Sequence, residues 1–289
     1  MALPNGKFVL DDDTPRSSKT TINIAGFNVY LYGVDELTPE QARDTTVVFH
    51  IHGRTRTYKD AEDLAHQVLH DLRQRPATRK GLVLATFDNR NHGERAIDAI
   101  SIADWNGGNQ KHGQDMLSTM DGIVADVQTI MTFLESYVDG QFAPTQFIIG
   151  GMSLGGHVSW DVLARDPRVD AAIIVVGCPD LTHMLHERLD GYLRTDGASQ
   201  QSSSPKEWPD SVERLYVARD QKVAEITGKK ILILNGEIDT LVPSKFTRTW
   251  LDKYGAKNDV IFVEQEVTGH ALSVQMVERI VDWLPQFLA

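Results

Sequence analysis

Short apolar segments that alternate with helical segments are the feature that most constrains how this chain can fold. The apolar segments, rich in valine and isoleucine, lie at 47–53, 82–89, 147–151, 171–178, 231–236 and 260–265. Since they are apolar at nearly every position, both faces of each strand should be covered, as in parallel sheets whose strands are connected by helices. The sequence therefore predicts an α/β fold with a mostly parallel, twisted sheet of about eight strands and helices on both faces.

The remaining segments complete this predicted sheet. Residues 20–34 contain two short runs around the turn Ala25-Gly26, which predicts an antiparallel hairpin at one edge. Helical periodicity predicts helices at 60–75, 121–138, from 154 onward, 244–254 and 271–288. The chain has 289 residues, enough for one large α/β domain, and we expect residues 1–289 to form a single domain.

Two long segments interrupt the alternation, at 94–120 and at 180–227. The second contains the polar stretch GASQQSSSP at 197–205 and then the helix-like stretch PDSVERLYVARD at 209–220. Loops of this length within a compact domain usually carry function or cover a site. We therefore expect a cap or lid insertion at 180–227, while a solvated loop explains the polar tip equally well.

The charge and cysteine content limit the partners and the compartment. The 29 basic and 40 acidic side chains give a net charge of −11, so nucleic-acid backbones and anionic membrane surfaces are repelled. The one cysteine, Cys178, lies in an apolar run and is expected to be a buried, inert thiol. No signal peptide or transmembrane segment is recognisable. These features predict a cytoplasmic protein and carry no information on its oligomeric state.

A serine between glycines follows the predicted strand at 147–151. The stretch IIGGMSLGGH has the pattern Gly151-x-Ser153-x-Gly155, between a strand and a helix. A sharp strand-to-helix turn holds such a serine in a strained conformation, and glycines around it avoid backbone collisions. The dipole and free amides of the helix that follows favour developing negative charge. This context predicts that Ser153 is a nucleophile.

A serine nucleophile needs a base, and the base needs an acid that orients it. His270 lies between the last predicted strand and the closing helix, and Asp239 follows the next-to-last strand. The chain order Ser153, Asp239, His270 and the position of all three at one edge of the sheet predict a catalytic triad. Asp180, which follows the predicted strand at 171–178, remains the alternative acid.

With these residues the chain resembles the α/β-hydrolase-fold serine hydrolases, from about Thr20 to the carboxyl terminus. In that family a His-Gly motif after an early strand supplies one amide of the oxyanion hole, and His52-Gly53-Arg54 occupies the matching place. The resemblance therefore implies that the backbone N–H groups of Leu154 and Arg54 form the oxyanion hole.

One residue and one stretch of the sequence bear further on this resemblance. Many family members have a small or apolar residue at the position of Arg54. A cation beside the acyl pocket would favour polar or acidic substrates, but we expect this side chain to face solvent. The stretch DNRNHG at 88–93 resembles the family's D-x-R-x-H-G loop. We interpret it as structural, with Arg90 and His92 bonded to backbone.

Four residues are candidates for contact with the substrate: His52, Trp105, Met152 and His183. Trp105 lies in the first insertion, where it either packs as a core residue under the loop or forms an aromatic wall of the pocket. Met152 flanks the nucleophile and is expected to pack beneath it, and His183 lies in the second insertion. No metal site is predicted, because His50 and His52 point to opposite faces of their strand.

The predicted function is that of a carboxylesterase-like serine hydrolase, which cleaves an ester of a small molecule through an acyl-enzyme. No cofactor is expected. A thioesterase, a prolyl-oligopeptidase-like peptidase and a binding or receptor protein without turnover remain alternatives. The motifs do not specify the acyl group, the leaving group or the pathway, because specificity in this fold depends on the insertions.

Overall fold

The computed structural model describes residues 6–195 and 206–289. Eight strands form one sheet in the order β1-β2-β4-β3-β5-β6-β7-β8, which confirms the predicted α/β fold. The pairs β1-β2 and β2-β4 are antiparallel, so the predicted edge hairpin is present, and the other neighbouring pairs are parallel. The strands are β1 (Lys19–Ile24), β2 (Phe27–Tyr32), β3 (Thr45–Ile51), β4 (Gly81–Phe87), β5 (Pro144–Met152), β6 (Val169–Val175), β7 (Lys230–Gly236) and β8 (Asp259–Gln265).

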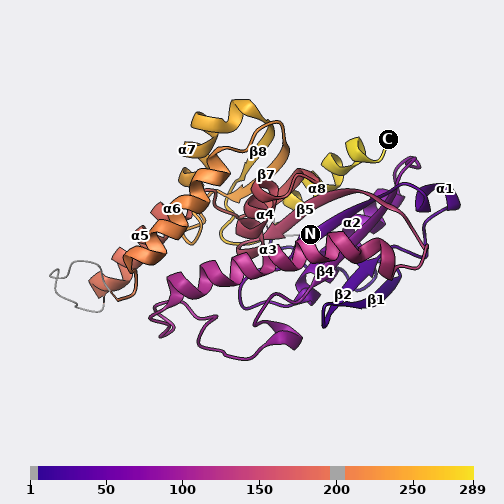
Figure 1. The fold of residues 1–289 in the computed structure, drawn as a ribbon. Helices are drawn as coiled ribbons and strands as arrows, with labels where there is room; N and C mark the ends of the chain where they lie inside the picture. Colours follow the sequence, from indigo (N-terminus) through magenta and orange to yellow (C-terminus); the bar gives the residue numbers. More distant parts are fainter. Residues whose placement is uncertain (1–5, 196–205) are drawn as a thin grey trace.

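Helices cover both faces of the sheet (Figure 1). They are α1 (Pro39–Ala42), α2 (Tyr58–Arg73), α3 (His112–Tyr137), α4 (Leu154–Arg165), α5 (Leu181–Thr195), α6 (Asp210–Ala224), α7 (Lys245–Tyr254) and α8 (Val274–Trp283). Val48 and Ile148 pack in one core cluster with α2 and α8. Their neighbours Phe49 and Ile149 pack in a second cluster with α3 and α4, because successive residues of a strand face opposite sides. Within the described ranges, no helix is long and apolar enough to cross a membrane.

Helix α3 begins at His112, well before the start predicted at residue 121. The early turns contain Gly113, which made a loop the better expectation from sequence. In the structure a Cβ at Gly113 would lie 2.8 Å from the ring of Trp208, so the missing side chain allows this ring to pack on the helix. Tyr216 also donates a hydrogen bond to the Gly113 carbonyl at 2.8 Å. Tertiary contacts thus extend the helix beyond its periodic segment.

The second insertion forms α5 and α6, which project together from the sheet beside the amino-terminal part of α3 (Figure 1). The expected helix at 209–220 corresponds to α6 and is confirmed. Trp208 stacks on Tyr216 with ring centroids 4.8 Å apart, and it lies near Trp105 at 6.4 Å. Through these rings the second insertion packs against the first insertion and the start of α3. The polar tip at 197–205 lies outside the described residues.

Candidate active site

Ser153 sits at the sharp turn between β5 and α4. Its backbone has φ 56° and ψ −114°, a sparsely populated combination that costs about 1–3 kcal/mol and persists only where the surroundings enforce it. The Ser153 amide donates to the Val175 carbonyl at 2.9 Å, which ties the turn to the end of β6. The strained conformation that the glycine pattern predicted is present.

The glycines on either side of Ser153 permit this turn. A Cβ at Gly155 would lie 2.6 Å from the carbonyl carbon of Ile51 and closer still to its oxygen. A Cβ at Gly151 would lie 2.8 Å from the Cα of Gly155. Both distances are too short for real side chains, because the obstacles are backbone atoms that cannot move aside. The expected collisions with a neighbouring strand and with the following helix are therefore confirmed.

Gly155→Ala is expected to lower the free energy of unfolding by about 3 kcal/mol, because the added methyl group overpacks the β3–α4 contact. Urea denaturation followed by circular dichroism measures this change. Gly191→Ala is the matched control: it also lies in a helix, and its added Cβ would have no heavy atom within 4 Å. This control should gain about 0.5–1 kcal/mol from helix propensity. An unchanged stability of Gly155→Ala would contradict the prediction.

Ser153, His270 and Asp239 form a hydrogen-bonded chain. His270 Nε2 lies 2.7 Å from Ser153 Oγ, and His270 Nδ1 lies 2.8 Å from Asp239 Oδ2. An ionised carboxylate only accepts hydrogen bonds, so Nδ1 carries the proton and Nε2 is the free acceptor that faces the serine hydroxyl. The Asp239 side chain is fully buried and that of His270 is 21% exposed. The arrangement can remove a proton from Ser153.

Backbone amides hold the Asp239 carboxylate in position. Its Oδ1 accepts hydrogen bonds from the amides of Leu241 at 2.8 Å and Val242 at 2.9 Å, which leaves Oδ2 for His270. The alternative acid, Asp180, bonds His183 Nδ1 at 2.8 Å. The structure thus brings Asp239, and not Asp180, to His270.

The two amides expected in an oxyanion hole lie beside Ser153. Leu154 is the first residue of α4, and Arg54 follows Gly53, where an added Cβ would lie 3.5 Å from Ser153 Cβ. Among the residues that the structure describes, neither amide has a hydrogen-bond partner. Both N–H groups are therefore available to an oxygen atom bound at Ser153.

His52 is buried and cannot reach a substrate, which corrects the expectation for this residue. The ring is buried, with 1% exposure. Nε2 accepts from the Asn89 amide at 3.0 Å and Nδ1 donates to the Gly53 carbonyl at 2.8 Å. Burial lowers the pKa of His52 to about 4, so the ring is neutral near pH 7. Both ring nitrogens bond backbone, and His52 shapes the loop that carries Gly53 and Arg54.

Met152 and Trp105 both pack against the hydrophobic core, and Trp105 also lines a cavity. Met152 is partly buried and packs against the core cluster on the α2 side of the sheet, as expected for a residue beneath the turn. Trp105 is 4% exposed and belongs to the other core cluster. It also lines a cavity of about 310 Å³ that includes His112 and Arg188. Trp105 is therefore a core residue under the loop, and its role as a wall of a substrate pocket stays a prediction.

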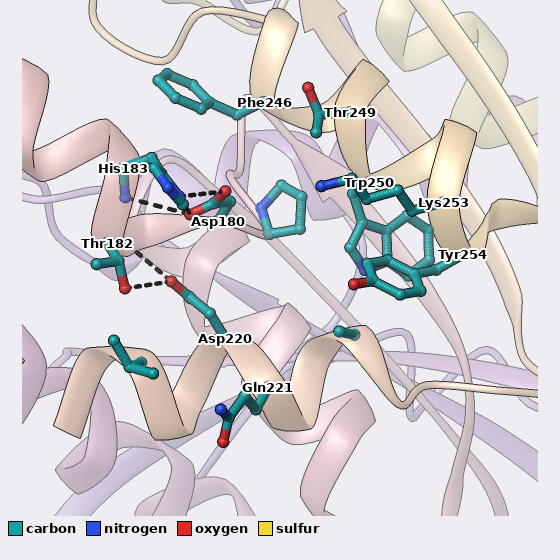
Figure 2. A pocket seen from close by; sticks show the side chains of 13 residues that line it. Asp180, Thr182, His183, Asp220, Gln221, Phe246, Thr249, Trp250, Lys253 and Tyr254 are labelled. Carbon is teal, nitrogen blue, oxygen red and sulfur yellow. Dashed lines mark hydrogen bonds and ion pairs between the residues drawn. The ribbon is translucent and has the colours of Figure 1, made fainter. Parts of the chain in front are cut away.

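His183 lines a different cavity, of about 240 Å³, between α5, α6 and α7. Figure 2 shows His183 and Asp180 facing each other on one side of it, opposite Trp250 and Tyr254. The His183 side chain is 75% exposed. None of Ser153, His270 and Asp239 belongs to the lining. His183 therefore lies away from the nucleophile, contrary to its expected place in the substrate pocket.

Two arginines bond to partners that the sequence did not indicate. Arg54 was expected to face solvent, but its Nη1 donates to the Ile102 carbonyl in the first insertion at 2.8 Å. Arg90 was expected to bond backbone, but it pairs with the carboxylate of Asp126 at 2.8 Å and 3.1 Å. His92 does bond backbone, through the Arg90 carbonyl at 2.8 Å. The DNRNHG stretch is therefore a structural loop anchored on α3.

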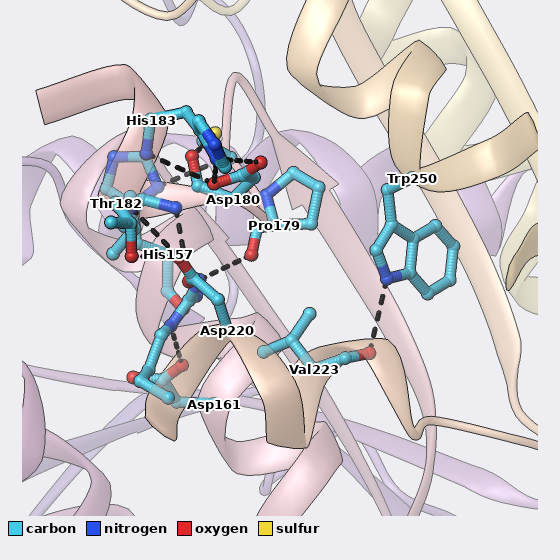
Figure 3. Close-up of polar contacts among 12 residues, drawn as sticks. His157, Asp161, Pro179, Asp180, Thr182, His183, Asp220, Val223 and Trp250 are labelled. Carbon is cyan, nitrogen blue, oxygen red and sulfur yellow. Dashed lines mark hydrogen bonds and ion pairs between the residues drawn. The ribbon is translucent and has the colours of Figure 1, made fainter. Parts of the chain in front are cut away.

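A buried ion pair joins α6 to the helix that follows the nucleophile. Arg219 Nε lies 2.6 Å from Asp161 Oδ1 of α4, and both side chains are at most 1% exposed. Arg219 also donates to the carbonyls of Pro179 and His157, and to Asp220. His157, Asp161, Pro179 and Asp220 converge at this point (Figure 3). The pair fixes the base of the second insertion against α4, the helix that follows Ser153.

The buried imidazole and thiol near this network have structural positions. Cys178 is fully buried, as expected, and burial raises the pKa of its thiol. Burial, together with the charges of Arg188 and Arg219, lowers the pKa of His157 well below its usual value, and His157 Nδ1 accepts from the Cys178 amide at 2.9 Å. In residues 6–195 and 206–289, no cluster of three or more His, Cys, Asp or Glu residues could hold a metal ion.

Sequence reasoning missed Arg188 and His112, which line the same cavity as Trp105. Neither belongs to a motif. Arg188 is one of several charged residues on α5, and His112 lies in a segment expected to be a loop. The signal available in the sequence was their location in the two insertions, where this kind of architecture builds its substrate pockets.

Several solved structures share this architecture. The structure is similar to TT1662 from Thermus thermophilus, with a TM-score of 0.65 and 19% identity, over 95% of this chain and 99% of that chain. It is similar to the Pyrococcus furiosus esterase Pf2001, with a TM-score of 0.55 and 13% identity, over 99% of this chain and 98% of that one. The Pyrococcus horikoshii acylaminoacyl peptidase has a TM-score of 0.62 and 12% identity, over 94% of this chain and 41% of that one. No protein-family model and no curated protein matches the chain.

These similarities identify the architecture. The chain has the α/β-hydrolase fold, with the eight-stranded, mostly parallel sheet and the strand-turn-helix that carries Ser153. The peptidase is a longer protein, of which this chain matches 41%. What these proteins share with the chain is therefore the fold.

Proposed function

We propose that the protein is a serine hydrolase that cleaves an ester bond of a small-molecule substrate. The observation that carries this proposal is the hydrogen bond of 2.7 Å between His270 Nε2 and Ser153 Oγ. A serine hydroxyl becomes an effective nucleophile when a neighbouring base removes its proton. The strained turn and the two unpaired amides beside it add further support, since each belongs to the machinery of acyl transfer.

In the proposed reaction Ser153 Oγ attacks the acyl carbon while His270 takes the hydroxyl proton. The oxyanion that forms accepts hydrogen bonds from the amides of Leu154 and Arg54, each worth about 3 kcal/mol in the transition state. His270 then protonates the leaving alcohol, and an acyl-enzyme remains. Water, activated by His270, releases the acid and restores Ser153. Asp239 orients the ring of His270 throughout and stabilises its charged form.

We further propose that residues 180–227 act as a cap over the site within a single domain, 1–289. The hydrogen bond from Arg188 of α5 to the carbonyl of Leu241, two residues after Asp239, supports this role. The buried Arg219–Asp161 pair argues that the base of the cap is rigid. Specificity would then depend on side chains of the cap rather than on its opening and closing.

A peptidase is the second candidate function, because two of the similar structures are acylaminoacyl peptidases from Pyrococcus horikoshii. The same triad chemistry cleaves esters, thioesters and peptide bonds. A series of 4-nitrophenyl esters of increasing acyl length, an acyl thioester and an aminoacyl 4-nitroanilide would separate these activities. We expect multiple turnover of the esters. A single slow acylation without further turnover would favour a binding or receptor protein instead.

Asp239→Asn is expected to lower kcat for an activated ester about 10⁴-fold, because an amide cannot hold His270 in the required tautomer. Asp180→Asn is the matched control, since this carboxylate bonds His183 rather than His270. We expect its kcat to stay within about threefold of the wild-type value, because the change lies outside the proposed triad. Stopped-flow or steady-state release of 4-nitrophenolate measures both. Loss of activity in Asp180→Asn with retention in Asp239→Asn would reverse the assignment of the acid.

A further inference from the structure

An arginine of α5 bonds the loop that follows Asp239 and takes no part in the chemistry described so far. Arg188 lines the 310 Å³ cavity together with Trp105 and Leu241. Leu241 is two residues after Asp239, and its amide donates to the Asp239 carboxylate at 2.8 Å. Another lining residue, Asp104, pairs with Arg54 at 3.6 Å. The cavity is therefore lined in part by the loop that follows Asp239 and in part by Asp104, the ion-pair partner of Arg54.

The Arg188 guanidinium is oriented by backbone but lacks an ion-pair partner. Nε donates to the Leu241 carbonyl at 3.1 Å, and Nη2 donates to the same oxygen. Among the described residues, no carboxylate lies within ion-pair distance of Arg188, and Nη1 has no hydrogen-bond partner. Burial lowers the pKa of Arg188 to about 10, so the group remains cationic at neutral pH. A partly buried cation without a partner is costly unless an anion joins it.

The other charged groups around Arg188 are paired with one another or bonded to other partners. Arg54 and Asp104, at 3.6 Å, largely offset each other. His112 adds no charge, because burial, with the nearby positive charges of Arg54 and Arg188, lowers its pKa to about 4. The Asp239 carboxylate acts on Arg188 through space, but it is hydrogen-bonded to His270 and to backbone amides. Among the described lining residues, Arg188 is then the one charge without an ion-pair partner, next to the apolar surfaces of Trp105 and Leu241.

We infer that Arg188 binds an anionic group of the substrate, a carboxylate, while the scissile ester lies at Ser153. The planar guanidinium, already held by Leu241, matches the geometry of a carboxylate, and pre-orientation reduces the entropy lost on binding. Trp105 and Leu241 would contact the hydrocarbon between the two polar groups. The substrate class is thus an ester that carries a carboxylate on its acyl part or its leaving group. This inference rests on the proposed esterase function.

The test compares substrates that differ only in charge. For the acyl side, the pairs are the mono-4-nitrophenyl esters of glutaric and adipic acid and the same esters with the free carboxylate converted to an amide. For the leaving group, the pair is 4-butanoyloxybenzoate and 4-butanoyloxybenzamide. The ratio of kcat/KM for carboxylate over amide is measured with wild-type protein, and Ser153→Ala serves as the blank. A preference in one of the two sets identifies the side of the ester that carries the anion.

The variants are Arg188→Gln, Arg188→Lys and the control Arg194→Gln, which removes the same charge from the exposed end of α5. We expect Arg188→Gln to lower the ratio about 10- to 100-fold, as for loss of a charged hydrogen bond, with kcat/KM for the amide substrates changed less than about threefold. Arg188→Lys should recover part of the ratio, and Arg194→Gln should leave it unchanged. Circular dichroism verifies that each variant folds.

Several outcomes would overturn the inference. They are a wild-type ratio near one for every pair, a ratio that Arg188→Gln leaves intact, and an equal loss in Arg194→Gln. If wild-type protein cleaves none of these esters faster than the Ser153→Ala blank, the proposed esterase function fails by itself. Titration calorimetry with adipate then tests whether Arg188 binds an anion. Binding that Arg188→Gln abolishes supports the anion site, and absence of binding by wild-type protein refutes it.

Discussion

Ser153→Ala is expected to lower kcat for an activated ester about 10⁴- to 10⁶-fold, the range found when the triad serine is removed from a serine hydrolase. The physical reason is that the oxyanion-hole amides remain but the acyl group has no nucleophile to join. His270→Ala should cause a loss of similar size, because Ser153 without a base stays a neutral hydroxyl. Release of 4-nitrophenolate, measured over hours at high protein concentration, covers this range.

The control for this experiment is Ser118→Ala, an exposed serine on α3 that donates to the Asp115 carbonyl. It should keep wild-type activity. The double variant Ser153→Ala/His270→Ala should be no less active than either single variant, because residues that act as one unit give non-additive losses. Ser153→Ala protein that retains a tenth of wild-type turnover would exclude the proposed mechanism.

Arg219→Met is expected to lower the free energy of unfolding by about 3–5 kcal/mol, because it leaves the buried carboxylate of Asp161 without its partner. The substitution also leaves the carbonyls of Pro179 and His157 without the guanidinium that donates hydrogen bonds to them. Burial acts to lower the pKa of Arg219, but the carboxylates of Asp161 and Asp220 raise it above its usual value. Arg219 is therefore positively charged in the folded protein, and the substitution removes a buried charge. Urea denaturation, with the slope compared between variants, measures the change.

Lys245→Met provides the matched control for a lost cation. Lys245 pairs with Glu187 of α5 on the surface, with both side chains more than half exposed, and its removal should cost less than about 1 kcal/mol. The double variant Arg219→Met/Asp161→Leu should recover part of the loss, because no unpaired charge then remains buried. A cost for Arg219→Met equal to that of the control would mean that the pair does not anchor α6.

Position along the chain was enough to predict the part of the site that depends on strand ends. Ser153, Asp239 and His270 follow β5, β7 and β8, and the carboxyl ends of parallel strands meet at one edge of a sheet. The residues at the pocket could not be predicted in the same way. His52 and His183 were both expected there, yet one bonds backbone in the interior and the other pairs with Asp180.

The sequence by itself determined the alternation of strands and helices outside the two insertions and the glycine-flanked turn at Ser153, because both depend on residue types at short spacing. Only the tertiary structure decided which charges meet. Arg188 and Leu241 are 53 positions apart, and Arg219 and Asp161 are 58 apart. Their side chains become neighbours when α5 and α6 pack on the sheet, and that packing depends on the shapes of many surfaces at once. Local residue patterns carry no record of such pairings.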